Sequence, residues 1–428
     1  MHKISKNPTK KILLTSLIAI ILLITITTVA LVFSNNNHES KNDSEIQSVH
    51  LTEPTEEDSE IENEDPIIDE EVMEEEVEEE RFTNLSIAAA GDIMFHMPQI
   101  RSAFVGNSQQ YNFKPVFEDV APYFSAADLA IANFETTLGG AERGFSGYPL
   151  FNSPDEVADA IKFAGIDVVS TANNHSLDTR TDGLKRTIQV FNEKGIDTVG
   201  TFAEPPTSRV LLKEINEIKV AILAYTESTN GLGDQYPADE LLNMLNLMEK
   251  DRILEDIEEA KSLEADFIVT FMHWGSEYME EPNETQVEFA QMMAEAGVDL
   301  ILGSHPHVIQ KSEVIKLDDH QTFVIYSLGN FISNQRKETL GDHRELTEDG
   351  VIVNIDIEKN HLTDETTITN VEYVPTWVYR HPKGGSNYTY RILPISEFLL
   401  SDEISQEYKS RMERSFDATT SKMIDNPF

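Results

Sequence analysis

Histidines that follow apolar runs are the residues of this chain best suited to chemistry. Residues 298–308 form an apolar run that stops at Gly303 and continues with His305 and His307. A near-continuous apolar run is typical of a buried strand, and residues just past its C-terminal end lie in the crevice where open α/β sheets bind ligands. Neutral imidazole is a ligand for Zn, Fe, Mn and Ni, and Pro306 limits how far the two rings move. The pair therefore predicts half of a metal site.

Five other apolar runs end in the same way. The polar side chains that follow them are Asp92, His96, Asn133, Glu135, Asn173, Asn174, His175, His273, Glu277 and Asn330. Each histidine alone could be a hydrogen-bonded structural residue, but their repeated placement after apolar runs favours a role as ligands. The chain has no cysteine, which excludes a disulfide scaffold, a thiolate zinc site and a cysteine nucleophile. Any metal must therefore be held by nitrogen and oxygen atoms.

A mixed set of carboxylate, amide and imidazole groups suits two divalent metals such as Mn, Fe or Zn. The predicted metal ligands are Asp92, His96, Glu135, Asn174, His273, His305 and His307. Two metals about 3.5–4 Å apart clamp the oxygens of a displacement at phosphorus or at a carbonyl. His175 could donate a proton to a leaving oxygen rather than bind metal. The sequence lacks a Walker-type loop, an H-E-x-x-H and a G-x-S-x-G, so nucleotide-loop, zincin and serine-hydrolase chemistry have no defining residues here.

A second set of residues could contact substrate or support the ligands. It consists of Asn133, Asn173, Trp274, Glu277, Tyr278 and Asn330. Trp274 and Tyr278 could stack on a substrate or pack in the core or rim. Glu277 could bind a substrate amine, although orienting His273 is the favoured role. Asn330 could cap a loop as readily as touch a ligand.

The chain resembles the CapA family, whose members are associated with poly-γ-glutamate capsule synthesis and whose domain is similar to the calcineurin-like metallophosphoesterases. The resemblance covers about residues 85–333 and rests on six blocks in order. The blocks are Gly91-Asp92 with His96, Asn133-Phe134-Glu135, Ala172-Asn173-Asn174-His175, His273-Trp274-Gly275 with Glu277-Tyr278, Gly303-Ser304-His305-Pro306-His307, and Ser327-Leu328-Gly329-Asn330-Phe331. It implies an αββα sandwich of two mixed sheets flanked by helices, with the site at its top edge.

The resemblance also implies roles for individual residues. Asp92 and His307 would bind the first metal, and Glu135 would stand where phosphoesterases place a bridging aspartate. The second metal would be bound by Asn174, His273 and His305, with His175 as the proton donor. Two departures weaken the inference of phosphatase activity more than that of metal binding: His96 lies four residues after Asp92 instead of two, and the bridging carboxylate is longer by one methylene.

The elements that must position these residues follow a β-α-β order, which predicts an α/β layered fold. Apolar residues at helical spacing predict helices over residues 155–163, 184–194, 241–263, 286–296 and part of 401–428. Alternating residues predict strands at 351–357 and 366–374, whereas 377–390 is a polar, glycine-containing segment. We expect a CapA-like, metallophosphatase-like domain at residues 82–335, with strands and a helix at 336–428 that complete or flank it.

The N-terminus predicts attachment to a membrane. Residues 1–11 carry four lysines and form the expected cytoplasmic tail, and the uncharged residues 12–33 are long enough to span a bilayer as a signal anchor. A cleaved signal peptide is the alternative. Residues 34–81 are strongly acidic and are expected to form a disordered linker. These features predict a single-pass protein of the cell membrane whose C-terminal domain is extracellular.

The charge of the chain limits its partners. Its net charge is −43, and without the −19 of residues 39–80 and the +4 of the N-terminal lysines, residues 81–428 carry −28. Such an acidic surface argues against nucleic acid as a partner. Together with the predicted anchor, the resemblance to the CapA family implies a membrane-anchored protein that takes part in the synthesis, export or processing of poly-γ-glutamate, with other capsule-synthesis membrane subunits as its expected partners. The alternative is a free-standing surface metallohydrolase, acting on phosphoester, amide or ester bonds of another wall polymer.

Overall fold

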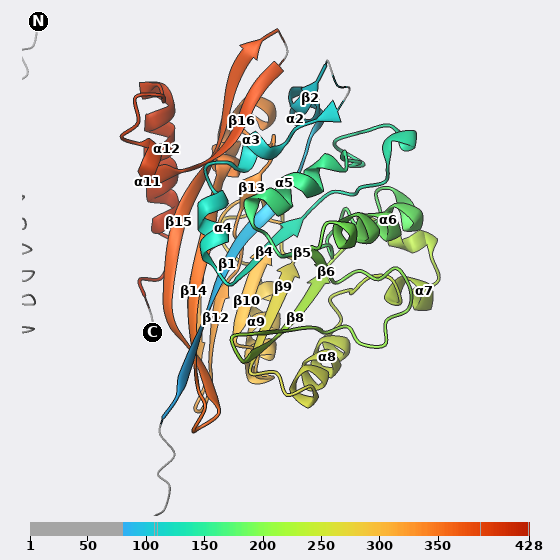
Figure 1. Cartoon of the computed structure of the whole chain (residues 1–428), viewed down its shortest axis with the longest axis vertical. Coiled ribbons are helices and arrows are strands. Elements are labelled where there is room, and N and C mark those ends of the chain that lie inside the picture. The colour runs from blue at the N-terminus through green and yellow to red at the C-terminus, as the bar shows by residue number, and fades with distance from the viewer. Residues whose placement is uncertain (1–79, 107, 109, 386, 427) are drawn as a thin grey trace, which may run out of the picture. The chain divides into compact units, whose positions relative to one another are not determined.

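Residues 80–428, except 107, 109, 386 and 427, are described by the computed structural model (Figure 1). They fall within one contact unit, Glu76–Phe428. The predicted cytoplasmic tail, the predicted signal anchor at residues 12–33 and the predicted linker up to residue 79 lie outside the described residues. Among the helices that are described, none is long and apolar enough to cross a bilayer.

The first sheet is mixed and carries β1, the strand that holds Asp92. Its order is β16 (Asn387–Pro394), β15 (Glu365–Gly384), β14 (Asp349–Asn360), β1 (Phe82–Ile93), β4 (Leu129–Phe134), β5 (Val168–Ser170) and β6 (Asp197–Val199), and β13 (Asn330–Ile332) also pairs with β1. The strands β1, β4, β5 and β6 are parallel, whereas β14, β15 and β16 are antiparallel to their neighbours. The sheet therefore joins residues from both ends of the domain.

The second sheet is also mixed. Its order is β11 (Ser312–Lys316), β12 (Gln321–Ile325), β10 (Leu300–Ser304), β9 (Phe267–His273), β8 (Ile218–Thr226) and β7 (Leu211–Ile215). The four central strands are parallel, and the two edge strands are antiparallel to them. A short separate ribbon pairs β2 (Phe104–Val105) with β3 (Gln110–Tyr111). The predicted α/β architecture with mixed sheets is confirmed.

Helices cover the outer faces of both sheets. They are α2 (Met97–Ala103), α3 (Lys114–Phe117), α4 (Ala121–Ala126), α5 (Glu156–Ala164), α6 (Arg180–Glu193), α7 (Ala238–Leu242), α8 (Lys250–Ser262), α9 (Glu284–Glu295), α10 (Lys337–Leu340), α11 (Ile395–Phe398) and α12 (Gln406–Thr420), with 3-10 turns η1 (Ala141–Arg143), η2 (Gly233–Gln235) and η3 (Asp342–Glu348). Side chains of α3, α4 and α5 pack on the first sheet, and those of α8 and α9 pack on the second.

Alternation along β1 shows how the layers are built. Leu85, Ile87 and Ala89 face a core shared by the two sheets, whereas Ala88 and Ala90 face the core beneath the helices. A period of two is expected of a strand that is covered on both faces. At an estimate of roughly 25 cal/mol for each Å² of apolar surface buried, these cores supply the main driving force for folding. The packing of these cores also fixes where the strand ends lie relative to one another.

Helix ends follow local sequence signals. Asn283 caps α9 by accepting a hydrogen bond from the backbone N–H of Gln286, and the Gln286 side-chain oxygen accepts one from the backbone N–H of Asn283. Gly297, just after the end of α9, has φ of 88°, and Gly165 ends α5 with φ of 90°. Glycine tolerates this left-handed conformation without the steric cost that other residues carry. The predicted stop at Gly297 is therefore confirmed.

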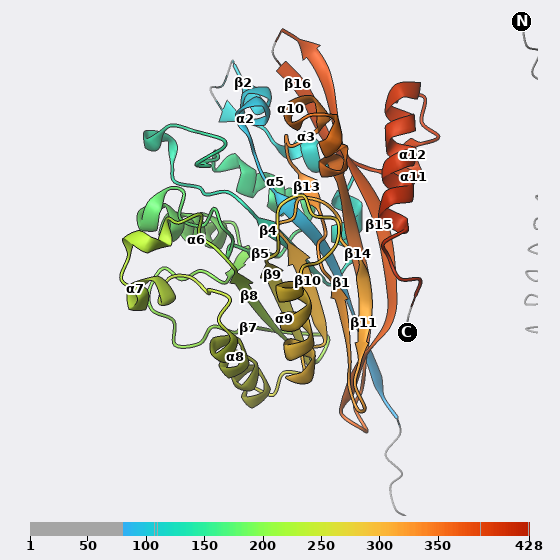
Figure 2. The ribbon, with the colours of Figure 1, turned by 180° about the vertical axis from the view of Figure 1, so that it is seen from behind.

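The C-terminal region differs from the prediction in one respect. Residues 377–390, expected to be a polar segment, belong to the long hairpin of β15 and β16. Trp377 and Tyr379 of this hairpin are buried against Met412 of α12, which lies along β15 in both views (Figures 1 and 2). The polar and glycine residues gather at the exposed hairpin turn, so composition alone masked the strands. The long helix expected within 241–263 is α8, which begins at Lys250, whereas the shorter α7 ends at Leu242.

Candidate metal centre

Strand register brings the predicted ligands to one edge of the two sheets. Asp92 lies opposite Asn133 in the parallel pair of β1 and β4, and Glu135 follows directly after β4. In the second sheet, His273 at the end of β9 lies opposite Ser304 at the end of β10. Directly after Ser304, His305 and His307 reach the first sheet, where the His305 backbone N–H and His307 Nδ1 both lie near Asp92 Oδ2. The carboxyl ends of parallel strands meet at one edge, which is where open α/β sheets bind ligands.

Two groups of potential ligands form there, and they share one carboxylate. Glu135, His273 and His305 make one group, and Asp92, Glu135 and His307 make the other, with the ligand atoms of each group within 4.8 Å of one another. Glu135 Oε1 lies 3.7 Å from His273 Nε2 and 3.8 Å from His307 Nε2. His307 Nδ1 lies 3.1 Å from Asp92 Oδ2. Glu135 therefore belongs to both groups of potential ligands, and each group could hold a cation.

Burial supports the assignment of the centre to metal. Glu135 Oε1 and His305 Nδ1 are buried and have no hydrogen-bond partner among the described residues. Burial, together with the charge of Asp92, raises the pKa of Glu135 well above its ordinary value. Burial and the neighbouring imidazoles lower the pKa of His273. Unpartnered polar atoms and adjacent buried carboxylates are costly without a compensating charge, and a bound cation would supply that charge.

Two asparagines hold the carboxylates in place. Asn133 Nδ2 donates to Asp92 Oδ1 at 2.8 Å and lies 3.5 Å from Glu135 Oε2. Asn173 Nδ2 donates to the Phe134 carbonyl at 2.8 Å and lies 3.3 Å from Asn133 Oδ1. Asn133 therefore orients the ligands, and Asn173 orients Asn133, which is the supporting arrangement that usually surrounds a metal site.

Asn174 and His175 lie side by side but have different environments. Asn174 Oδ1 is 3.2 Å from His273 Nε2, at the edge of the second ligand group. His175 Nδ1 is 2.7 Å from Asp178 Oδ2, and its ring meets the edge of Phe151 with centroids 4.7 Å apart. Because Asp178 engages Nδ1, Nε2 is the nitrogen left to exchange a proton. His175 is outside both ligand groups, and its role as a proton donor stays a prediction.

Asp178 was not identified from the sequence as a site residue. It also accepts a hydrogen bond from the backbone N–H of Phe151 at 2.6 Å. Burial raises the pKa of Asp178, although its contact with His175 opposes the rise. The only local signal was the spacing of three residues between His175 and an acidic residue. That spacing is common, so its meaning depends on the folded loop.

His96 lies beside the centre but outside the two ligand groups. It is the residue before α2, and its Nδ1 accepts a hydrogen bond from the backbone N–H of Asn334 at 3.3 Å. Burial, followed by the charge of His307, lowers the pKa of His96 to about 4. The strand β1 ends at Ile93, so the four-residue spacing from Asp92 carries His96 into the following turn. Its role as a ligand stays a prediction.

Residues 86–335 match the family described as bacterial capsule synthesis protein PGA_cap. The chain belongs to this family. Its curated relatives include "Capsule biosynthesis protein CapA" of Bacillus anthracis, which is 32% identical over 262 residues, or 59% of this chain and 60% of the relative. "PGA biosynthesis protein CapA" of Bacillus subtilis is 29% identical over 64% of this chain and 68% of the relative. The chain thus spans about three fifths of the length of the first relative.

Solved structures show partial likeness to this PGA_cap chain. The NAD nucleotidase NadN of Haemophilus influenzae is 12% identical, with a TM-score of 0.43 over 80% of this chain and 64% of the other. The calcineurin-like phosphoesterase YfkN of Bacillus subtilis is 13% identical, with a TM-score of 0.40 over 80% of this chain and 98% of the other.

The two aromatic residues that follow His273 have different environments. Trp274 is fully buried and donates from Nε1 to the Tyr326 carbonyl at 3.0 Å, so it packs in the core rather than facing a substrate. Tyr278 lies at the rim, with its ring 6.0 Å from the His307 ring. Of the two interpretations left open by the sequence, packing therefore applies to Trp274, whereas stacking of a substrate on Tyr278 stays a prediction.

The polar candidates Glu277 and Asn330 also differ. Glu277 is exposed, and the Nδ1 atom of His273 lies 3.0 Å from Ser304 Oγ, so a serine occupies the orienting position that the sequence suggested for Glu277. Asn330 Nδ2 donates to the carbonyl of Thr347 at 2.9 Å and lies 3.3 Å from that of His307. Asn330 thus ties the histidine loop to η3.

The histidine loop has an unusual backbone. His305 and His307 have φ of 94° and 59°, and Tyr278 has φ of 66°. Non-glycine residues held in this region cost about 1–3 kcal/mol each and cluster at functional sites. The backbone N–H of Tyr278 donates to the Pro306 carbonyl at 2.7 Å, which holds the two loops together. Part of the backbone strain of the PGA_cap chain therefore lies where the candidate ligands are presented.

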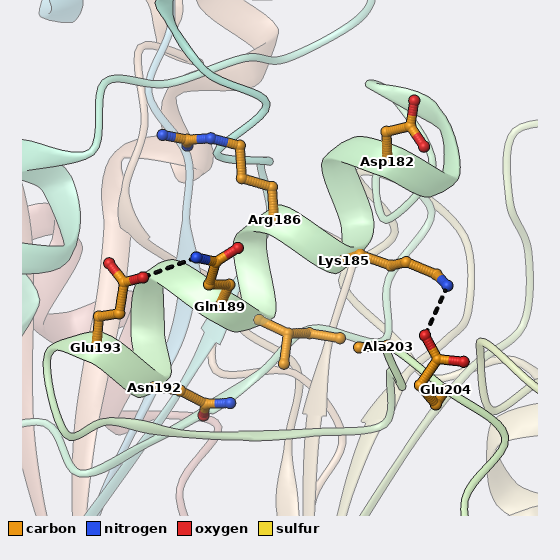
Figure 3. A pocket seen from close by; sticks show the side chains of 9 residues that line it. Asp182, Lys185, Arg186, Gln189, Asn192, Glu193, Ala203 and Glu204 are labelled. Carbon is orange, nitrogen blue, oxygen red and sulfur yellow. Dashed lines mark hydrogen bonds and ion pairs between the residues drawn. The ribbon is translucent and has the colours of Figure 1, made fainter.

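A surface hollow beside α6 lies apart from this centre (Figure 3). None of the predicted ligands lines it. Its side chains pair with one another: Lys185 Nζ lies 3.2 Å from Glu204 Oε1, and Gln189 donates to Glu193 at 2.8 Å. The hollow is therefore a self-satisfied polar surface and not an extension of the metal centre.

Proposed function

We propose that this protein takes part in the synthesis, export or processing of poly-γ-glutamate through a centre that binds two divalent ions. The observation that carries the proposal is the pair of ligand groups that share Glu135. The family match and the names of the Bacillus relatives support the connection with a capsule polymer. Bound divalent ions would act as Lewis acids toward a carbonyl or phosphoryl oxygen.

The residues around the centre suggest hydrolytic processing. His175 is held by Asp178 at 2.7 Å and is itself outside the ligand groups, so its Nε2 atom can deliver a proton to the nitrogen or oxygen that leaves. Asn133 holds the carboxylates and Asn173 holds Asn133, which lowers the reorganisation needed during a reaction. A purely structural site would not require a separate imidazole–carboxylate pair. The bond we favour as substrate is the γ-glutamyl amide, with a phosphoester of another wall polymer as the second candidate.

We further propose that residues 12–33 anchor the protein in the cell membrane and that the family domain lies outside. The basic residues before this apolar stretch and the acidic residues after it motivate the proposal. Protease added to intact cells should release a fragment that contains the domain. A domain that is cut only after cell lysis would reverse the proposed orientation.

The metal proposal is tested by elemental analysis of the purified full-length protein. The wild type should carry one or two divalent ions after growth with added Mn or Zn. Glu135→Gln should lose both, because this carboxylate belongs to both ligand groups. His343→Asn, at an exposed histidine, is the matched control and should keep them. Metal-free wild-type protein after supplementation would refute the proposal.

A further inference from the structure

Two arginines outside the matched family region, Arg344 and Arg380, stack on tyrosine rings. Arg344 lies in η3, with its guanidinium carbon 4.2 Å from the centre of the Tyr278 ring. Arg380 lies in β15, with its guanidinium carbon 3.9 Å from the centre of the Tyr388 ring. Stacking attracts a cation to the ring face and leaves the N–H groups at the guanidinium edge free to donate. Both side chains are therefore positioned before any ligand arrives.

Neither arginine forms an ion pair with a carboxylate within the described residues, in contrast to their neighbours. The other four arginines of residues 336–428 all pair with Asp or Glu side chains; they are Arg336, Arg391, Arg411 and Arg414. The described part of the chain is strongly acidic, so carboxylate partners are abundant. Within the described residues, the lack of a carboxylate partner therefore distinguishes Arg344 and Arg380 from the other arginines of this region.

Both arginines are connected to the centre through consecutive residues. Arg380 Nη1 lies 3.4 Å from Asn334 Oδ1, and the backbone N–H of Asn334 donates to His96. On the other side, Gln335 Nε2 lies 3.4 Å from the hydroxyl of Tyr278, the ring on which Arg344 stacks. The segment of Asn334 and Gln335 therefore has one arginine on each side.

The supporting elements hold this arrangement at the centre. The helix α2 begins directly after His96 and lies beside β16, the partner strand of β15 (Figure 1). Tyr390 of β16 donates from its hydroxyl to Asn334 Oδ1 at 2.7 Å. Tyr278 connects the other side, since its ring lies 6.0 Å from that of His307. Neither arginine is thus on a free loop remote from the ligands.

We infer that Arg344 and Arg380 bind carboxylate groups of an anionic polymer on the two sides of the metal centre. This inference rests on the proposed function and assigns the residues that select the substrate. A guanidinium edge matches a carboxylate with two parallel hydrogen bonds. The net charge of −28 on residues 81–428 repels a polyanion, so local positive charge is needed for the polymer to reach the centre. Glu277, exposed beside Tyr278, increases that need.

The test measures polymer binding apart from turnover. Full-length protein loaded with Mn is titrated into a fluorescent γ-glutamate oligomer at low ionic strength, and anisotropy gives the Kd. Arg344→Gln and Arg380→Gln should each weaken binding by roughly tenfold, the value of one charge-assisted contact. Arg344→Lys should fall between wild type and Arg344→Gln, because it keeps the charge but loses the planar fork. Elemental analysis should give the same metal content for every variant.

A matched control removes the same charge elsewhere. Arg252 pairs with Glu255 at 3.7 Å on α8, and Arg252→Gln should bind the oligomer as the wild type does. If Arg344→Gln and Arg380→Gln also bind like the wild type, the inference is wrong while the proposed function stands. If metal-loaded wild type does not bind the oligomer at all, the proposed function fails and the inference with it. Tighter binding of inorganic polyphosphate, lost in the same two variants, would overturn the assignment of a carboxylate polymer.

Discussion

Replacing Arg411 by Met should destabilise the domain strongly, because it leaves a buried carboxylate short of its main partner. Arg411 comes from α12 and donates from Nη2 to both oxygens of Glu348, whose side chain is fully buried. The remaining partners of Glu348 are the Trp377 indole N–H at 3.1 Å, the Lys337 backbone N–H at 3.2 Å and Arg336 at 3.7 Å. The pair also holds α12 against the first sheet.

The magnitude follows from the partners that remain. Removing one member of a buried ion pair typically costs about 3–5 kcal/mol. Arg336 and two neutral donors still compensate Glu348 in part, so we expect a loss of about 2–4 kcal/mol in the free energy of unfolding. Neutralising Glu348 as well, in the double variant Arg411→Met with Glu348→Gln, should recover at least about 1 kcal/mol, because no uncompensated charge is then buried.

Urea unfolding followed by tryptophan fluorescence is a suitable assay, since both tryptophans of the chain are buried. The guanidinium carbon of Arg411 lies 5.1 Å from the centre of the Trp377 ring. Arg143→Met is the control, because Arg143 and its partner Asp182 are exposed and such pairs contribute about 0–1 kcal/mol. An Arg411→Met variant no less stable than this control would refute the reasoning. Strictly additive single substitutions would show that the two side chains are not coupled.

Four further predictions concern the centre and its supports. His175→Ala should keep its metal but lose about 10²–10⁴ in turnover of a γ-glutamyl or phosphoester substrate, and unchanged turnover would exclude proton transfer through this residue. For the metal-free protein, the pKa of His96 is about 4 in the folded state and 6.5 ordinarily, so between these pH values the unfolded state binds the extra proton. The free energy of unfolding should therefore be retained above pH 6.5 and fall by at most about 3 kcal/mol towards pH 4. The pH profile of this free energy should be flatter in His96→Gln. Gly303→Ala should destabilise by at least about 1–3 kcal/mol in thermal unfolding, because the new Cβ would lie 2.0 Å from the Tyr326 carbonyl oxygen. Deleting residues 44–79 should shift the melting temperature of the domain by only about 1–2 °C, since few buried contacts would be lost, and a large drop would show that this segment packs on the domain.

The sequence alone was sufficient to predict the α/β architecture and many of the polar residues that gather at the strand ends. Apolar runs of strand length are a local property, and so is the placement of Asp92, Glu135 or His273 at their ends. Helix stops at glycine are local as well, which is why Gly297 was correctly predicted to end α9. The lack of cysteine excluded thiolate ligands without any knowledge of the fold.

Hairpin formation at residues 377–390 could not be predicted, because the strands there are decided by partners far along the chain. Trp377 and Tyr379 are buried by α11 and α12, whereas the glycines that suggested a loop occupy only the turn. The unpaired state of Arg344 and Arg380 is likewise a property of the folded surface. Counting charges along the sequence does not distinguish these two arginines from the nearby arginines that form ion pairs.

Strand ends can be located from nearby residues, but which ends meet is decided by pairing and packing over long distances. Asp92 and His307 are 215 residues apart in the chain, but His307 Nδ1 lies 3.1 Å from Asp92 Oδ2 in the fold. The register of β1 with β4, and of β9 with β10, makes Glu135 common to both ligand groups and sets Ser304 beside His273. Because a one-residue slip of a strand would turn its side chains to the opposite face, only the packed sheets could fix which atoms face one another.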